Sequence, residues 1–339
     1  MGTRLTITPP GDYVLRRDVC SYGYFLLAPN RWEPKTGTLE RVLGLSEGSA
    51  RVVIGQEGGA GGRLGVKADR GLSKKEQGEA KRQIARMLSL EDEGVGEFHR
   101  VDPRWSGKVK GNAKGRGRLF RSPTFFEDLI KTVTSCNVAW PSTVRMNQRL
   151  CEVFGPAFPS EGRLARARAS TLRGRCGVGY RDKRMVELAK LVAGGEVDPE
   201  WFEDPGVGDE EVYEALLELP GIGPYSAANV LQLLGRYSRL AIDTESIRHG
   251  KTVLGMEGTD AEVTRALEKH YSGFGRHKFR SYWFELWTWY EGKRGAAWTW
   301  SQEEVGSSFT AAAFRQEEAA ALGAVVKKGV ARRGRARSG

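Results

Sequence analysis

A glycine-containing turn between two amphipathic stretches is the feature that most constrains how this 339-residue chain folds. The turn is Leu219–Pro224, and the stretch before it places apolar side chains at helical spacing. Pro224 suits the first turn of a second helix, which Gly235 ends. Two glycines one residue apart leave the turn free of side chains, so backbone N–H groups and a helix N-terminus can approach an anion. The sequence therefore predicts a helix-hairpin-helix that binds a phosphate through its main chain.

An aspartate follows this turn at an informative distance. Asp243 lies eighteen residues after Tyr225, which is itself two residues after the second glycine. This constellation resembles the helix-hairpin-helix (HhH-GPD) DNA glycosylases, in which a hairpin of the form L-P-G-[IV]-G is followed by an aspartate. In the lyase-competent branch of that family, a lysine stands at the position of Tyr225. The resemblance covers about residues 121–295, and it implies a base-excision enzyme with a monovalent cation at the hairpin carbonyls and no other cofactor.

Asp243 is the candidate catalytic residue. When an N-glycosidic bond breaks, the sugar gains oxocarbenium character, so a nearby carboxylate stabilises the positive charge and can orient or deprotonate water. The alternative is a helix N-cap, because Asp before Thr244-Glu245-Ser246 commonly begins a helix. The two roles are compatible, since a cap position presents its side chain at an exposed helix end.

The hairpin is the candidate DNA-binding element. Pro220, Gly221, Ile222 and Gly223 are expected to hold the phosphate beside the lesion through backbone N–H groups, and Ser226 to add a hydroxyl. An ordinary tight turn between two helices is the alternative.

Tyr225 indicates the subclass. A lysine at this position would attack the sugar to form a Schiff base, and a phenol cannot do so. The sequence thus predicts a monofunctional glycosylase that uses water. An aromatic residue at this position resembles the alkylpurine branch of the family, where it lines the base pocket. An electron-rich ring face attracts the positive charge of an alkylated purine. Simple helix packing is the alternative role.

Further site candidates come from two other segments. The stretch from Phe125 to Cys151 resembles the helix-loop-helix that opens this domain in 8-oxoguanine glycosylases, where Asn137 matches the asparagine that fills the space left by the extruded base. A loop asparagine that caps its own backbone is the alternative. Trp140 and Tyr180 are candidates for the base pocket, and Tyr180 belongs to a Gly-Tyr-Arg element that also resembles the family. Both residues could instead serve packing alone.

Positive charge is concentrated in three segments. Residues 104–121 carry seven Lys and Arg and no acid, residues 162–184 carry eight against one acid, and residues 327–337 carry six against none. Because the chain as a whole carries +11, the remainder is acidic. Such local charge is typical of a surface that binds a polyanion. The expected partner is double-stranded DNA that contains a damaged base.

The four cysteines are scattered, with no metal-like spacing, and none follows Cys176. This pattern predicts a reducing compartment and no metal site. It also predicts that the chain lacks the iron–sulfur loop found near the C-terminus of some helix-hairpin-helix glycosylases. No apolar run approaches the length of a membrane span. We expect the protein to be a monomer. Its expected location is the nucleus, and location in another organelle is the alternative.

The chain divides into four predicted parts, and their fold class is α+β. Residues 1–103 form a small β-rich domain, and residues 104–120 a flexible, basic, glycine-rich linker or loop. Residues 121–300 form a mainly helical glycosylase domain, and residues 301–339 a basic, disordered tail. Strands are expected at residues 4–8, 22–27, 39–43, 51–54 and 63–67. Helices are expected near residues 73–88, 125–136, 142–154, 182–192, 209–219, 224–234, 243–254, 260–271 and 279–290.

The sequence predicts a monofunctional DNA glycosylase that removes a flipped-out damaged purine, with alkylated bases favoured. An 8-oxoguanine-type glycosylase and a non-catalytic DNA-binding protein with the same hairpin are the alternatives.

Overall fold

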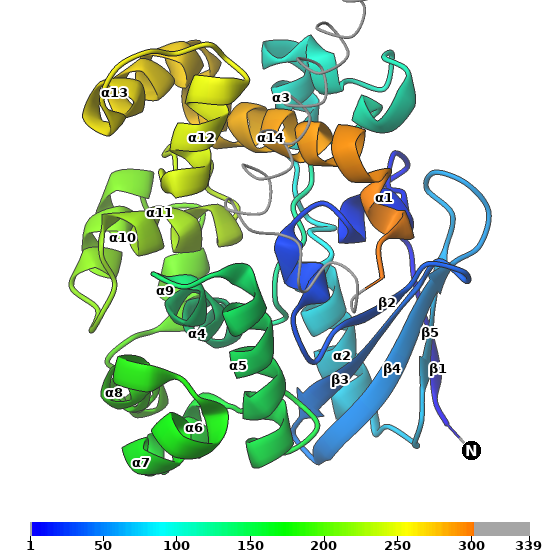
Figure 1. Ribbon diagram of the computed structural model, residues 1–339. Coiled ribbons are helices and arrows are strands. Elements are labelled where there is room, and N and C mark those ends of the chain that lie inside the picture. The colour runs from blue at the N-terminus through cyan, green and yellow to red at the C-terminus, as the bar shows by residue number, and fades with distance from the viewer. Residues whose placement is uncertain (1, 302–339) are drawn as a thin grey trace, which may run out of the picture.

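The computed structural model describes residues 2–301. Within them, a small antiparallel sheet near the N-terminus packs beside a larger helical part, as the α+β prediction requires (Figure 1). The predicted basic tail lies, beyond Ser301, outside the described residues.

The sheet has five strands in the order β1-β5-β4-β3-β2, and every neighbouring pair is antiparallel. Along β3, the alternate residues Leu39, Arg41 and Leu43 are buried, so one face of the sheet meets the core. Helix α2 packs against that sheet and begins at Ser73, whose side chain forms the predicted capping box with Glu76. The strands are β1 (Arg4–Ile7), β2 (Arg31–Glu33), β3 (Thr38–Leu45), β4 (Gly48–Gln56) and β5 (Leu64–Ala68), and α2 is Lys74–Met87.

The strand predicted at residues 22–27 is wrong. This segment forms a 3₁₀ helix, η1 (Gly23–Leu26), which follows the short helix α1 (Leu15–Val19). Nearly every residue of the segment is buried, so its burial has no two-residue alternation. A continuous apolar run does not distinguish a buried strand from a buried helical turn.

The segment of residues 104–120 is not a flexible linker throughout. It follows α3 (Val95–Val101) and contains two short 3₁₀ helices, η2 (Pro103–Trp105) and η3 (Gly111–Ala113). In its second half, Arg116 and Arg118 are buried and pair with Glu291 at 2.5 Å and Asp12 at 2.7 Å. These ion pairs fix residues 116–120 against the rest of the molecule.

The predicted helices after residue 121 are all present, and their ends differ from the expected ones by a few residues. The structure adds several short helices that the periodicity did not reveal. The helices are α4 (Phe125–Ser135), α5 (Trp140–Phe154), α6 (Glu161–Ala165), α7 (Ala169–Thr171), the π-helical turn η4 (Leu172–Cys176), η5 (Gly179–Arg181), α8 (Asp182–Gly194), α9 (Pro199–Glu203), α10 (Asp209–Leu217), α11 (Pro224–Leu233), α12 (Thr244–Thr252), α13 (Asp260–Tyr271), η6 (Ser272–His277), α14 (Lys278–Arg294) and η7 (Ala297–Thr299).

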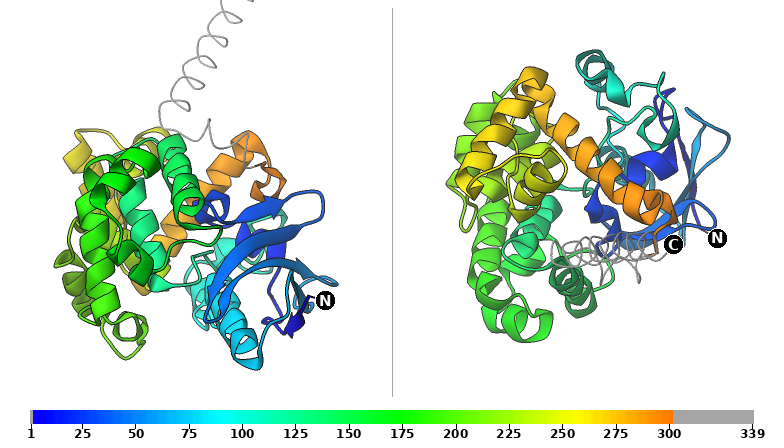
Figure 2. Two further views of the ribbon diagram at one scale, coloured as in Figure 1. Left: turned by 90° about the horizontal axis from the view of Figure 1, so that it is seen from below. Right: turned by 45° about the horizontal axis from the view of Figure 1, so that its top comes forward.

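Helix α14 joins the two parts of the molecule. It runs between the helical part and the N-terminal segments, as the right-hand view of Figure 2 shows. Its Trp283 and Trp287 donate indole N–H bonds to the carbonyls of Ser21 at 2.8 Å and Cys20 at 3.0 Å. Buried side chains from both parts form one continuous core. Residues near position 22 are thereby placed against the helical part.

Candidate active site

Asp243 occupies the N-cap of α12. Its Oδ1 accepts hydrogen bonds from the backbone N–H groups of Glu245 at 3.0 Å and Ser246 at 2.9 Å, and from the Ser246 hydroxyl at 3.0 Å. Its Oδ2 accepts no hydrogen bond from the described residues. One oxygen therefore caps the helix while the other remains available at a cavity that the residue lines.

The surroundings of Asp243 act on its pKa in opposite directions. Burial by the cavity walls raises the pKa above the ordinary value, and the hydrogen bonds from Ser246 and Glu245 lower it. The net result is a raised pKa. The residue nevertheless retains an exposed surface toward the cavity. Asp243 is thus a solvent-reachable carboxylate in a largely apolar setting.

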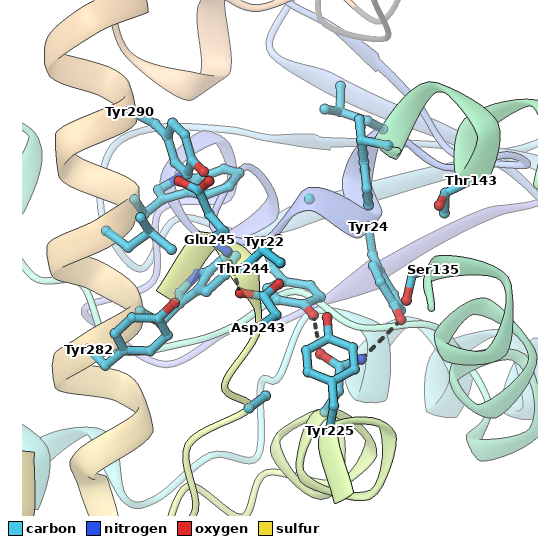
Figure 3. Close-up of a pocket in the computed structure, with 18 of the residues that line it drawn as sticks. Tyr22, Tyr24, Ser135, Thr143, Tyr225, Asp243, Thr244, Glu245, Tyr282 and Tyr290 are labelled. Atoms are coloured by element: carbon cyan, nitrogen blue, oxygen red, sulfur yellow. Dashed lines mark hydrogen bonds between the residues drawn. The ribbon is translucent and has the colours of Figure 1, made fainter. Parts of the chain in front are cut away.

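The cavity beside Asp243 has a volume of about 420 Å³, which suits a small-molecule-sized ligand (Figure 3). Its walls come from η1, the loop before α5, α11, the start of α12 and α14. They contain two acids and no described lysine, arginine or histidine, but Glu245 pairs at 2.6 Å with the buried Arg248, so Asp243 is the wall acid without an ion pair among the described residues. Nine other lining residues are aromatic: Tyr22, Tyr24, Trp140, Tyr225, Phe279, Tyr282, Trp283, Trp287 and Tyr290.

A buried hydrogen-bond network fixes one wall of this cavity. Asn229 of α11 accepts a hydrogen bond from the Tyr22 hydroxyl at 2.7 Å and donates to Thr132 Oγ1 at 2.9 Å. The hydroxyls of Tyr24 and Thr132 lie 3.0 Å apart. The network joins η1, α4 and α11, so the tyrosine rings are held in fixed positions.

The aromatic residues of α14 form a second wall. The rings of Trp283 and Trp287 stack with centroids 5.3 Å apart, and Trp283 also meets the Tyr22 ring at 4.7 Å. Tyr282 shares a hydrogen bond of 2.8 Å with the Ser246 hydroxyl, which also bonds Asp243. Figure 3 shows Tyr282 and Tyr290 on α14 facing the Asp243 side of the cavity.

A wider groove of about 920 Å³ opens next to the cavity. The two share the walls formed by Tyr225, Asp243 and Thr244, and by residues of the loop between α4 and α5. The hairpin forms one side of the groove, and Tyr180, Arg181 and Arg184 border it as well. Asp243 therefore lies where the groove meets the cavity.

The hairpin backbone is exposed to this groove. Gly221 has φ +80°, and a Cβ there would lie 2.6 Å from Cδ of Arg184, so the position requires glycine. The N–H groups of Gly221 and Gly223 have no hydrogen-bond partner among residues 2–301. Tyr225 and Ser226 lie in the first turn of α11, where N–H groups lack helical partners. The hairpin therefore leaves backbone N–H donors available beside the groove.

Two of the predicted phosphate contacts are wrong. Pro220 has no N–H group and does not line the groove. The Ile222 N–H group is occupied by the Leu219 carbonyl at 3.0 Å, and its side chain is buried. Ser226 lines the groove, but its hydroxyl lies 3.0 Å from Cys136 Sγ in a mostly buried position.

Asn137 lies at the groove in the loop between α4 and α5. It is exposed and has φ +53°, a left-handed conformation that asparagine tolerates better than most residues. The loop is fixed by Arg181, which is buried and donates hydrogen bonds to the carbonyls of Val133 at 3.0 Å and of Cys136. The Arg181 guanidinium therefore supports the loop that carries Asn137.

Of the three predicted base-pocket residues, two line the cavity and one lies on the groove. Tyr225 and Trp140 line the cavity, and the Trp140 ring lies against the backbone of Gly23. Tyr180 does not line the cavity. It is 55% exposed on the groove, where the guanidinium groups of Arg181 and Arg184 lie against its ring.

Sequence reasoning missed the contribution of the N-terminal part. Tyr22, Gly23 and Tyr24 line the cavity, yet their segment resembled an ordinary strand. Asn229 was also missed, although a polar residue in the otherwise apolar run of α11 signalled a buried hydrogen-bond network. Several aromatic residues of α14 line the cavity as well, and their helical spacing alone does not distinguish this role from core packing.

Residues 2–301 contain neither a metal-binding cluster nor a helix that could span a membrane. No three His, Cys, Asp or Glu side chains there gather in a way that would hold a metal ion. The same residues contain no helix of the length and apolarity that crossing a membrane requires.

Known structures share this architecture. A 3-methyladenine DNA-glycosylase from Archaeoglobus fulgidus is similar, with a TM-score of 0.64 and 19% identity over 84% of this chain and 98% of that chain. The 8-oxoguanine glycosylase/lyase of Clostridium acetobutylicum gives a TM-score of 0.61 and 17% identity, over 84% and 97% of the two chains. The same enzyme in complex with double-stranded DNA gives a TM-score of 0.59 and 16% identity, over 87% and 98%. No protein-family model matches the chain.

The chain therefore has the fold of the helix-hairpin-helix (HhH-GPD) DNA glycosylases.

Proposed function

We propose that this protein is a DNA N-glycosylase that hydrolyses the N-glycosidic bond of a flipped-out, cationic alkylated purine. The observation that carries the proposal is the juxtaposition of Asp243 Oδ2 with a cavity walled by aromatic rings and acids. The groove beside that cavity offers unpartnered backbone N–H groups at Gly221 and Gly223.

The hairpin and the groove support DNA as the partner. Backbone N–H groups at a helix N-terminus bind phosphate without a charged side chain. The carbonyls of Pro220, Gly221 and Ile222 accept no hydrogen bond from the described residues, so their chemistry fits a monovalent cation. A cation held there would add positive charge beside the phosphate. The similar Clostridium enzyme has been solved with double-stranded DNA.

The reaction follows from the position of Asp243. A nucleotide rotated out of the duplex places its base in the cavity and its sugar near the junction with the groove. As the base departs, the carboxylate stabilises the cationic sugar, and Oδ2 accepts a proton from the attacking water. Oδ1 stays bound to the α12 N-terminus, so the carboxylate is already oriented before substrate binds.

The absence of a suitable amine favours a monofunctional enzyme. A lyase needs an amine to attack the sugar, and no described lysine lines the cavity or the groove. Tyr225 stands in the place of the family's lysine, and burial together with the charge of Asp243 raises the pKa of its phenol well above the ordinary value. We therefore expect no covalent adduct above background when the protein is treated with borohydride during reaction with damaged DNA.

The cavity wall favours a cationic base. Ring faces of tyrosine and tryptophan attract positive charge. Asp243 adds negative potential at the cavity, whereas the charge of Glu245 is compensated by the buried Arg248 at 2.6 Å. A neutral oxidised purine would gain less from this environment. Asn137 at the groove keeps an 8-oxoguanine-type activity as the second candidate, since it matches the asparagine of that branch.

A panel of substrates tests the proposal. Duplexes that carry 3-methyladenine, hypoxanthine, 8-oxoguanine or uracil are incubated with the protein, and alkali then cleaves the abasic sites. We expect release of the alkylated base in preference to the three neutral bases. Preferential release of 8-oxoguanine would establish the second candidate, and no release from any duplex would leave a non-catalytic DNA-binding protein.

A further inference from the structure

The two basic clusters within the described residues differ in their availability. In residues 104–121, three of the four arginines pair with the protein's own acids. Arg104 bonds Asp102 at 2.7 Å and Glu285 at 2.6 Å, and the buried Arg116 and Arg118 pair as described above. Three of the four arginine charges of this cluster are therefore compensated within the molecule, and Lys108, Lys110 and Lys114 supply its exposed charge.

The second cluster lies on the surface. Arg175, Lys183 and Arg184 of residues 162–184 are exposed, and the half-buried Arg149 of α5 lies next to this segment at Gly177. None of these four side chains forms an ion pair with a residue in the described part of the chain. We call Arg149, Arg175, Lys183 and Arg184 the basic face.

The basic face continues from the groove. Arg184 lines the groove and lies against Gly221 of the hairpin. Lys183 precedes it in α8, which follows η5 and its groove residue Tyr180. The turn η4, which carries Arg175, contacts both η5 and α5. The Arg149 guanidinium from α5 approaches Gly177, directly after η4.

We propose that the basic face binds the phosphate backbone of duplex DNA beyond the nucleotide in the cavity. The proposal rests on the proposed function for the identity of the polyanion. Each contacted phosphate releases condensed counterions, so the face supplies affinity that falls with salt and does not depend on base sequence. Its continuity with the hairpin means that one duplex can meet both surfaces. The face thereby supports binding to undamaged DNA during the search for a lesion.

The test compares two triple variants of the full chain with equal loss of charge. The first replaces Arg149, Arg175 and Lys183 by Gln and leaves Arg184 at the hairpin intact. The matched control replaces Lys75, Lys81 and Arg82 by Gln, which are exposed on α2 and line neither the cavity nor the groove. Fluorescence anisotropy measures Kd for an undamaged 25-base-pair duplex over a series of salt concentrations, and thermal melting checks that both variants fold.

We expect the basic-face triple variant to bind the duplex roughly tenfold or more weakly than the wild type at low salt. The plot of log K against log salt should also become less steep, with the magnitude of its negative slope reduced by about 2 to 3. The α2 triple should keep the wild-type slope. The double variant Arg149→Lys/Arg175→Lys, which retains Lys183, should also keep the wild-type slope, because the charge is unchanged. Equal slopes for the two triples would overturn the proposal. The binding measurement is independent of base release, so this result differs from failure of the proposed function, in which the wild type releases no base from any damaged duplex.

Discussion

Asp243 combines a structural and a chemical task in one side chain. Oδ1 satisfies the N-terminus of α12, and Oδ2 is left to act at the cavity. The two interpretations of this residue from sequence, a helix cap and a catalytic carboxylate, are therefore both compatible with its geometry. An asparagine would keep a cap oxygen but would lose the negative charge, which makes it the informative substitution.

The raised pKa of Asp243 leads to a pH prediction. The carboxylate is the active form, so base release should fall about tenfold per pH unit once the pH is below the pKa of Asp243 in the folded protein. Because burial raises this pKa, the acid limb should lie above the ordinary value of 3.8. Single-turnover rates measured against pH would show it. An acid limb at or below the ordinary aspartate value would contradict the assignment.

The two hairpin glycines should respond differently to alanine. Gly221 has φ +80° and has Arg184 at 2.6 Å from the position of a Cβ, so Gly221→Ala should destabilise the protein by about 1–2 kcal/mol. Gly223 has φ −109° and no atom within 4 Å, so Gly223→Ala should leave the free protein nearly as stable. Both changes should weaken binding to DNA with an abasic-site analogue, because both methyl groups approach the phosphate. Urea unfolding and anisotropy separate these effects, and equal unfolding free energies for the two variants would contradict the account.

At the scale of elements, long helices with an apolar stripe were predictable and short buried turns were not. The stripe of α4 or α13 repeats over several turns, whereas η1 is too short to show any period. The hairpin and the distance to Asp243 were predictable because they are local in sequence. The aromatic walls were not, because they depend on which face of α14 meets the segment around residue 22.

The loop between α4 and α5 should depend on Arg181. This buried guanidinium donates to the carbonyls of Val133, Cys136 and Val178. Arg181→Gln should lower the free energy of unfolding by about 2–3 kcal/mol, because buried carbonyls lose charge-assisted partners. Arg181→Lys should not fully rescue it, since an ammonium lacks the planar fork. Urea denaturation measures both variants, and a wild-type unfolding free energy in Arg181→Gln would contradict the role.

At the scale of the whole molecule, the sheet and the helices are joined by buried charge. Glu127 of α4 pairs with Arg41 of β3 at 2.8 Å and with Lys131 at 2.6 Å, and all three side chains are buried. The cavity likewise takes residues from both parts. The site therefore exists only when the N-terminal segments and the helical part are packed together.

Removal of the shared carboxylate tests this coupling. Glu127→Gln leaves two buried cations without a counter-charge, so we expect a loss of about 3–5 kcal/mol in the free energy of unfolding. Tryptophan fluorescence and far-ultraviolet circular dichroism should still report one coincident transition, because the core is continuous. Exposed Glu187→Gln on α8 is the control and should change little. Separate transitions for the two probes would show that the parts unfold independently.

The most direct test of the central claim compares base release by the wild type and by Asp243→Asn under single-turnover conditions with an alkylated duplex. The account predicts that Asp243→Asn slows release by at least about 10²-fold, while its Kd for the same duplex stays close to that of the wild type. Release at the wild-type rate by Asp243→Asn would contradict the role of this carboxylate in breaking the glycosidic bond.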